Sequence, residues 1–117
     1  MSRAALSAAL TPSVEAIMRE ACTRAIMPRY QALAAGHVDA KAPDDLVTVA
    51  DHESEALLTD HLSWLLPDAQ VVGEEAAHAD PAILAQLGEG LCWIVDPLDG
   101  TNNFAAGKPP FGVIVAW

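Results

Sequence analysis

The sequence predicts a single mixed α+β domain in which helices pack in layers on a sheet. Three observations support this fold class. Two segments in the first half carry apolar residues at helical spacing, and short β-branched runs follow in the second half. The apolar fraction is 52% over 117 residues, which suffices for one hydrophobic core and argues against disorder.

The first predicted helix covers about Thr11 to Ala35. Thr11 suits the cap and Pro12 the first helical position. We expect Pro28 to kink or shorten this helix and Gly36 to end it. The helix has an apolar stripe at helical spacing, formed by Val14, Ile17, Met18, Ala21, Ala25 and Ile26.

Residues 37–48 are polar and predicted to be irregular, and a second helix follows from about Val49 to Leu66. Pro67 ends it. Its predicted buried face is a set of leucines, namely Leu57, Leu58, Leu62, Leu65 and Leu66. A short strand is then expected at Gln70–Gly73 and a short helix at about 80–87, closed by Gly88.

Two further strands are expected, at Leu91–Val95 and Phe111–Trp117. Pro97 cannot continue a strand ladder, so we expect the chain to turn as it leaves Val95. The last apolar run has no turn, cap or polar tail after it, and a strand left this way exposes an apolar edge. We therefore expect a domain that is incomplete at its C-terminal end.

The charge balance is strongly acidic, with 16 acidic against 6 basic residues and a formal net charge of −10. All acids except Glu15 and Glu20 lie between Asp39 and Asp99. This balance argues against nucleic acid as a partner, because phosphates require a basic footprint. It fits a cation-binding protein, and it equally fits a solvated acidic surface.

Cellular location is predicted from the cysteines and the N-terminus. Cys22 and Cys92 are far apart without metal-binding spacing, so we expect free thiols in a reducing compartment. The N-terminal Ala/Leu run leads directly into a helical pattern, which argues against an export signal, and no apolar run is long enough to span a membrane. We expect a cytoplasmic protein with no membrane partner.

The segment 96–101 (DPLDGT) combines residue types that suit metal and phosphate binding. Asp96 and Asp99 are three residues apart and can converge, and the Leu98 carbonyl can point to the same place. Such oxygens are the ligands that Mg²⁺ prefers. Gly100 allows close backbone approach, and a helix starting at Thr101 would offer amides to an anion. The same residues are also typical of an ordinary β-turn.

Four other residues have two interpretations each. Glu74 and Glu75 follow a predicted strand, as ligands often do, but can be surface charge. Asp51 begins a helix and can serve either chemistry or the helix dipole. Lys41 can lie near a metal site or in a solvated loop. No role is assigned to the histidines, which lack metal-ligand spacing: His37, His52, His61 and His78.

Together these motifs resemble a known family. D-L-V-T-x-x-D at 45–51, G-E-E at 73–75 and W-I-V-D-P-L-D-G-T-x-N-F at 93–104 are similar to the inositol monophosphatase family of magnesium-dependent, lithium-sensitive phosphatases. The likeness runs from about Thr11 to Trp117. Asn102 stands where threonine is commoner in that family.

The resemblance implies a set of roles. Two or three Mg²⁺ ions would be held by three carboxylates and one backbone carbonyl, those of Glu74, Asp96, Asp99 and Leu98. Asp51 and Thr101 would orient and deprotonate the attacking water, and Glu75 would be a supporting acid. The amides of Gly100 and Thr101, with the threonine hydroxyl, would hold the phosphate.

The resemblance also implies a fold and an activity. The fold would be a layered helix/antiparallel-sheet sandwich of the sugar-phosphatase type, with residues 1–117 as its N-terminal metal-binding part and the C-terminal domain absent. The activity would be hydrolysis of a small phosphorylated substrate by a homodimer, with inositol 1-phosphate as the leading substrate and histidinol phosphate or other sugar phosphates as alternatives. A second hypothesis is a non-catalytic domain that binds metal and phosphate.

Overall fold

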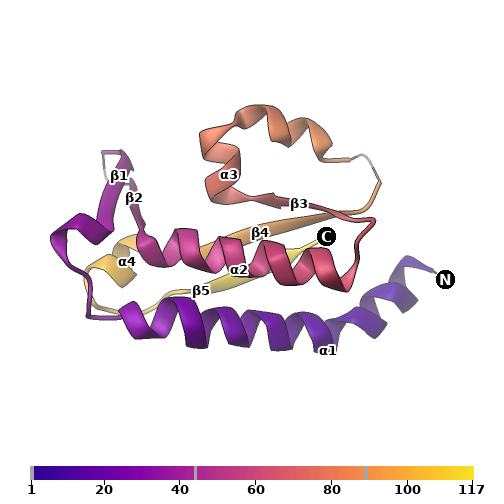
Figure 1. The fold of residues 1–117 in the computed structure, drawn as a ribbon, viewed down its shortest axis with the longest axis horizontal. Helices are drawn as coiled ribbons and strands as arrows, with labels where there is room; N and C mark the ends of the chain where they lie inside the picture. Colours follow the sequence, from indigo (N-terminus) through magenta and orange to yellow (C-terminus); the bar gives the residue numbers. More distant parts are fainter. Residues whose placement is uncertain (1, 44, 89) are drawn as a thin grey trace.

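A computed structural model describes residues 2–43, 45–88 and 90–117 (Figure 1). Its α-helices are α1 (Arg3–Ala21), α2 (Val49–Leu65), α3 (Glu74–Ala79) and α4 (Thr101–Ala105). Its strands are β1 (Val38–Ala42), β2 (Asp45–Thr48), β3 (Gln70–Gly73), β4 (Cys92–Asp99) and β5 (Gly112–Ala116). A π-helical turn at Cys22–Ile26 and 3₁₀ turns at Met27–Arg29, Ala35–His37 and Pro81–Gln86 complete the elements.

The strands form two sheets, and the larger has the order β3-β4-β5. Helices α1 and α2 lie side by side, and α2 packs along β4 (Figure 1). The α+β layered class is therefore confirmed. The sheet is mixed rather than wholly antiparallel, because α3 and the following 3₁₀ turn form a crossover that makes β4 parallel to β3, while β5 returns antiparallel.

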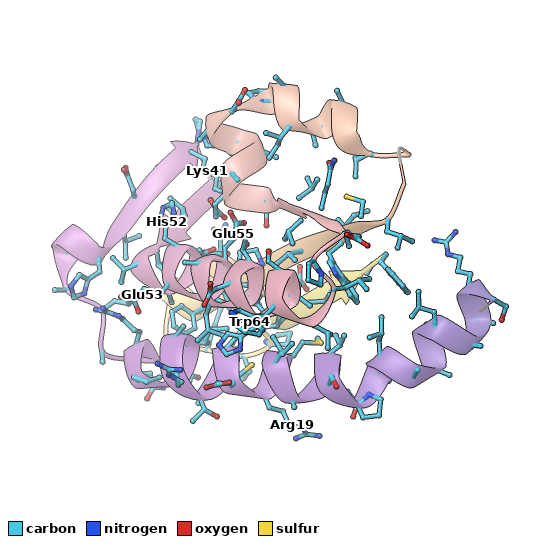
Figure 2. All side chains as sticks on the ribbon, turned by 45° about the vertical axis from the view of Figure 1, so that its right-hand side comes forward. Arg19, Lys41, His52, Glu53, Glu55 and Trp64 are labelled. Atoms are coloured by element: carbon cyan, nitrogen blue, oxygen red, sulfur yellow. The ribbon has the colours of Figure 1, made fainter. Side chains whose placement is uncertain are left out.

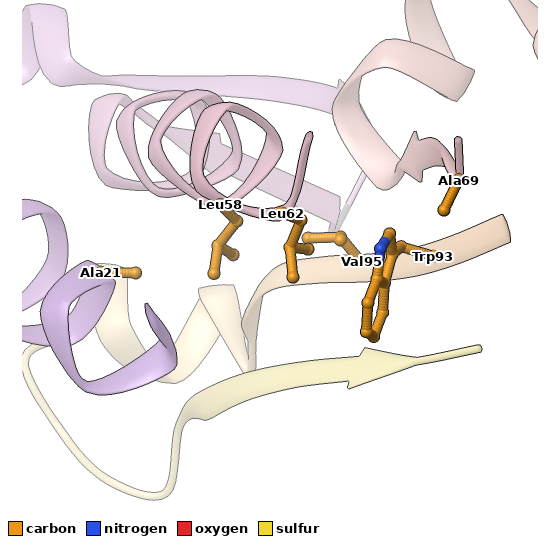
Figure 3. Close-up of a cluster of buried hydrophobic side chains, with 6 residues drawn as sticks. All are labelled: Ala21, Leu58, Leu62, Ala69, Trp93 and Val95. Carbon is orange, nitrogen blue, oxygen red and sulfur yellow. The ribbon is translucent and has the colours of Figure 1, made fainter. Parts of the chain in front are cut away.

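Two hydrophobic clusters hold these layers together. The first joins α1, α2 and the sheet through Ala21, Leu58, Leu62, Ala69, Trp93 and Val95 (Figure 3). The second lies under the end of β4 and consists of Ile26, Ala50, Leu98 and Phe104. Leu98 and Phe104 are 1% and 0% exposed, so the segment between them is anchored at both ends.

The first helix begins earlier than predicted. It starts at Arg3, where the Ser2 side chain accepts a hydrogen bond from the Ala5 amide (3.1 Å), and Pro12 lies inside the helix. The alanine-rich residues 3–10 have high helix propensity, which extends the helix N-terminal to Pro12. The α-helix does end before Pro28, as expected. Gly36 is not its stop, because the chain is already extended at Tyr30.

Two other expectations were wrong, and one helix was missed. Residues 37–48 are not irregular, because β1 and β2 form an antiparallel hairpin there; Asp44 lies outside the described residues. The short helix expected at about 80–87 is present as the 3₁₀ helix Pro81–Gln86, which Asp80 caps, but a further short helix, α3, begins directly at Glu74 and was not predicted. The strand predicted to end at Val95 continues to Asp99.

Strand β4 continues through Pro97 because its neighbours change along its length. Pairing with β3 ends at Val95, and pairing with β5 shifts register between Asp96 and Asp99. Pro97 therefore lies at a bulge where no ladder amide is required. The bulge separates the Asp96 and Asp99 positions without reversing the chain, so the predicted turn is not present.

The remaining elements agree with prediction. Helix α2, β3, the helix start at Thr101 and β5 lie within a residue or two of their expected bounds. Cys22 and Cys92 are free thiols. Within residues 2–43, 45–88 and 90–117, no helix is long and apolar enough to cross a lipid bilayer.

Candidate active site

The turn from β4 into α4 depends on Gly100. Its φ of 81° lies in the left-handed region, and a Cβ there would come within 2.7 Å of the Pro110 carbonyl oxygen. A side chain at this position would be strained both by conformation and by space. The turn places Thr101 as the first residue of α4. The side-chain oxygen of Asn102 accepts a hydrogen bond from the Leu46 amide of β2 (3.1 Å).

Thr101 and Asp51, fifty positions apart in sequence, are in direct contact. The Thr101 hydroxyl oxygen lies 2.9 Å from Asp51 Oδ1 and 2.9 Å from the Leu98 carbonyl oxygen. Asp51 is 1% exposed. Its other oxygen accepts from the amide (2.9 Å) and the hydroxyl (2.7 Å) of Thr48 in a capping box. Asp51 thus completes the capping box of α2, in which Thr48 is the N-cap, and also orients Thr101.

Glu74 and Asp96 come together at the ends of β3 and β4. Asp96 Oδ1 accepts a hydrogen bond from the Leu98 amide (3.3 Å) and the carboxyl group is partly buried. Burial, together with the hydrogen bond and negative charge of Glu74 and the charge of Asp99, raises the pKa of Asp96 from 3.8 to about 6, although the Leu98 amide opposes this. The carboxylates of Glu74 and Asp96 therefore meet, with the charge of Asp99 acting on Asp96 as well, and their mutual repulsion favours a bound cation or proton.

Glu75 is not surface charge, because its side chain is only 5% exposed. It accepts an ion-pair hydrogen bond from Lys41 Nζ at 2.9 Å, and Glu74 lies 3.7 Å from the same nitrogen. Burial acts to lower the pKa of Lys41, but the hydrogen bond to Glu75 and the charges of Glu75, Glu74 and Asp45 outweigh it and raise this pKa. Lys41 therefore lies beside the carboxylates, on strand β1 instead of in a loop.

The predicted ligands suit Mg²⁺ by their chemistry, since they are carboxylate and carbonyl oxygens. Their arrangement is not a ready-made cage: in the described part of the chain, no three Asp, Glu, His or Cys side chains form a group that could hold a metal ion. Two carboxylates, those of Glu74 and Asp96, do meet. Leu98 is two residues from Asp96, and its carbonyl accepts a hydrogen bond from the Thr101 hydroxyl. These residues fit an ion that uses a backbone oxygen.

Two buried polar residues of α2 were missed by sequence analysis. The Ser54 hydroxyl donates to the Pro97 carbonyl (2.8 Å), and the Glu55 carboxylate accepts from the amides of Glu75 and Ala76 (2.8 Å each). A signal existed in the sequence. Positions 51, 54 and 55 continue the helical spacing of Leu58 and Leu62, so polar residues there had to face the interior.

Comparison with known proteins finds one matching family. The model of the inositol monophosphatase family matches residues 8–117. An inositol-1-monophosphatase of Mycobacterium leprae is 45% identical over 83 residues, covering 69% of this chain and 28% of the relative. A fructose-1,6-bisphosphatase/inositol-1-monophosphatase of Thermotoga maritima is 34% identical over 73 residues, covering 62% of this chain and 25% of the relative.

Solved structures extend the match to the fold. The extragenic suppressor protein suhB of Bartonella henselae superposes with a TM-score of 0.73 and 31% identity, over 92% of this chain and 40% of that one. An IMPase of Thermotoga maritima superposes with a TM-score of 0.68 and 26% identity, over 92% of this chain and 38% of that one. The chain thus spans less than half the length of these relatives, and it belongs to the inositol monophosphatase family.

Proposed function

We propose that this chain forms the metal- and phosphate-binding part of a Mg²⁺-dependent phosphatase that hydrolyses a phosphate monoester with activated water. The observation that carries the proposal is the contact of Thr101 with both Asp51 and the Leu98 carbonyl, next to the Glu74–Asp96 pair. These groups come from four separate elements, and folding brings them to one end of the sheet. Residues 1–117 would be the N-terminal part of a longer domain of this family.

Glu74, Asp96, Asp99 and the Leu98 carbonyl would hold the two or three ions. Bound Mg²⁺ neutralises the phosphate dianion, lowers the pKa of water and stabilises the leaving oxygen. Asp96 is central among these groups, since both Glu74 and Asp99 act on its ionisation. Lys41 lies 3.7 Å from Glu74 and offsets part of the negative charge before a metal binds.

The Thr101–Asp51 pair would orient and deprotonate the water. The Thr101 hydroxyl has one proton, which it donates to Asp51 or to the Leu98 carbonyl, and it keeps lone pairs that can accept a proton from water. Both hydrogen bonds from Thr48 hold one carboxylate oxygen of Asp51, Oδ2, so the other oxygen, Oδ1, points toward Thr101. This fixed geometry suits general base catalysis through the hydroxyl.

The substrate would be a small phosphorylated molecule, with its phosphate on the amides of Gly100 and Thr101. Inositol 1-phosphate is the first candidate, because the relatives from Mycobacterium leprae and Thermotoga maritima are both named for inositol monophosphatase activity. Histidinol phosphate and other sugar phosphates are the alternatives. By family likeness we further propose a homodimer, which sedimentation velocity of the purified chain would test.

The test is phosphate release from inositol 1-phosphate by the purified chain, with and without Mg²⁺. We expect release that requires Mg²⁺ and falls at least about 100-fold in Asp51→Asn, because a base contributes about 10²–10⁴ to such reactions. His52→Gln, on the exposed side of the same helix, is the matched control and should retain activity. Measurable Mg²⁺-dependent release at equal rates in Asp51→Asn and wild type would refute the assignment.

A second candidate function for the 117-residue chain alone is Mg²⁺ binding without turnover. The length of the match favours this candidate, since the chain covers only 40% of the Bartonella henselae structure. Calorimetric titration with Mg²⁺ separates the two candidates. Binding without phosphate release supports the second, and Mg²⁺-dependent release that is lost with Asp51→Asn supports the first.

A further inference from the structure

Helix α2 contacts each of the three elements that carry the site. Its buried polar residues Asp51, Ser54 and Glu55 lie at successive positions of one helix face. Asp51 contacts α4, Ser54 contacts β4 and Glu55 contacts α3, each by hydrogen bonds of 2.8 to 2.9 Å. The contact of Asp51 with Thr101 already has a proposed catalytic role, whereas no function has been proposed so far for the contact of Glu55 with α3.

Glu55 holds the start of α3 through its backbone. Its two carboxylate oxygens accept from the amides of Glu75 and Ala76, both at 2.8 Å, and the residue is 8% exposed. Figure 2 shows Glu55 on the side of α2 that faces α3. These amides belong to the second and third residues of α3, whose first residue is Glu74. A charged, bidentate acceptor in a buried place makes strong and directional hydrogen bonds. The hydrogen bonds that Glu55 on α2 accepts therefore fix the position of the Glu74 backbone.

The glycine before the two glutamates follows from the same contact. A Cβ on Gly73 would overlap the carboxylate carbon and Oε1 of Glu55. The backbone of Gly73 is ordinary extended chain, with φ −96° and ψ 151°, so conformation alone does not require glycine here. Gly73 is thus small because Glu55 occupies the space above it.

A second contact restrains the same helix from strand β1. Lys41 of β1 binds the side chain of Glu75, with 8% and 5% of the two side chains exposed. Glu55 binds the backbone of Glu75 and Lys41 binds its side chain, so α3 has little freedom to rotate. Glu74, at its first position, is left to face Asp96.

We propose that Glu55 is a positioning residue that sets the place of Glu74 beside Asp96 and thereby the affinity of the site for Mg²⁺. The inference rests on the proposed function, because it assumes that Glu74 and Asp96 bind the ion. Glu55 itself acts only through the α3 backbone. Residues that orient metal ligands in this way typically change metal affinity by about 10–100-fold when substituted.

The test measures Mg²⁺ affinity by calorimetric titration of the purified chain, with folding checked by circular dichroism. Glu55→Gln keeps the shape but can accept only one of the two amide hydrogen bonds, so we expect the Kd for Mg²⁺ to rise at least about tenfold. Asp60→Asn makes the equivalent change at an exposed position of α2 and should leave the Kd unchanged. A merely structural role would lower the urea midpoint of Glu55→Gln without changing its Kd.

A double-mutant cycle tests the link to Gly73. Gly73→Ala should weaken Mg²⁺ binding by displacing the Glu55 carboxylate. In a Glu55→Ala background the added methyl group has room, so the double variant should bind like Glu55→Ala alone. Additive effects would overturn the explanation by displacement.

The outcomes separate this inference from the proposed function. If wild type takes up no Mg²⁺, the proposed function fails and the inference falls with it. If wild type binds Mg²⁺ and Glu55→Gln binds it equally, the inference alone is overturned. If neither Glu55→Gln nor Glu55→Ala folds, Glu55 is a structural residue and the positioning role is rejected.

Discussion

Asp96→Asn should make the metal-free chain more stable while it removes Mg²⁺ binding. In the folded chain the Asp96 carboxylate lies against Glu74 and near Asp99, which raises its pKa from 3.8 to about 6. Asparagine resembles the protonated acid: its amide nitrogen can donate to Glu74, and its oxygen can still accept from the Leu98 amide. The substitution therefore removes repulsion without removing hydrogen bonds.

The magnitude follows from the pKa. A shift of about two units corresponds to about 3 kcal/mol at 1.36 kcal/mol per unit, and solvent screening of a partly exposed carboxylate reduces it to about 1–2 kcal/mol. A folded pKa above the unfolded value means that the native state binds the proton more tightly. The loss of folding free energy that Asp96 causes in wild type is thus absent below the unfolded pKa of 3.8. It grows as pH rises and reaches its full value above about pH 6.

The assay is thermal or urea unfolding of both proteins without metal, at about pH 8 and about pH 4. At about pH 8 the variant should unfold about 4–10 °C higher, and at about pH 4 the difference should nearly vanish. Addition of Mg²⁺ should stabilise wild type alone, since ligand binding to the native state raises its stability. Asp60→Asn, at an exposed position, should show neither effect.

Two results would contradict this reasoning. A metal-free Asp96→Asn chain that is less stable than wild type at about pH 8 would show that the carboxylates do not repel one another. Equal stabilisation of both proteins by Mg²⁺ would show that Asp96 is not a ligand.

Three further predictions follow from contacts at the site. Thr101→Val should reduce Mg²⁺-dependent phosphate release by at least about 100-fold, whereas Thr101→Ser, which keeps the hydroxyl near Asp51, should retain most of it. Gly100→Ala should destabilise the chain by about 1–3 kcal/mol in urea unfolding, because of its φ of 81° and the nearby Pro110 carbonyl; an unchanged midpoint would argue against this turn. Lys41→Met should cost about 3–5 kcal/mol, because it leaves the buried Glu75 without its partner, and Lys41→Arg should cost clearly less.

Local sequence patterns predicted several elements and most of the proposed site. Helix α2 and strand β3 were predictable because their apolar spacing and the flanking Pro67 and Gly73 are local signals. The β1–β2 hairpin was missed, although apolar and charged residues alternate along Val38–Ala42, because the charged residues and Pro43 between the two strands favoured a loop interpretation. Pro97 misled the prediction for β4, because proline excludes a strand only where a neighbouring strand requires the amide, and that depends on the partner.

The sequence by itself determined which residue types are available: acids at 74, 96 and 99, a glycine–threonine helix start and an aspartate at 51. Only the tertiary structure decided how they meet. Thr101 reaches Asp51 because α2 packs along β4, and Glu75 is buried because Lys41 approaches from the hairpin. The helical spacing indicates that Glu55 is buried but not what it contacts, because its partners are backbone amides 20 and 21 positions away, and every residue except proline has such an amide.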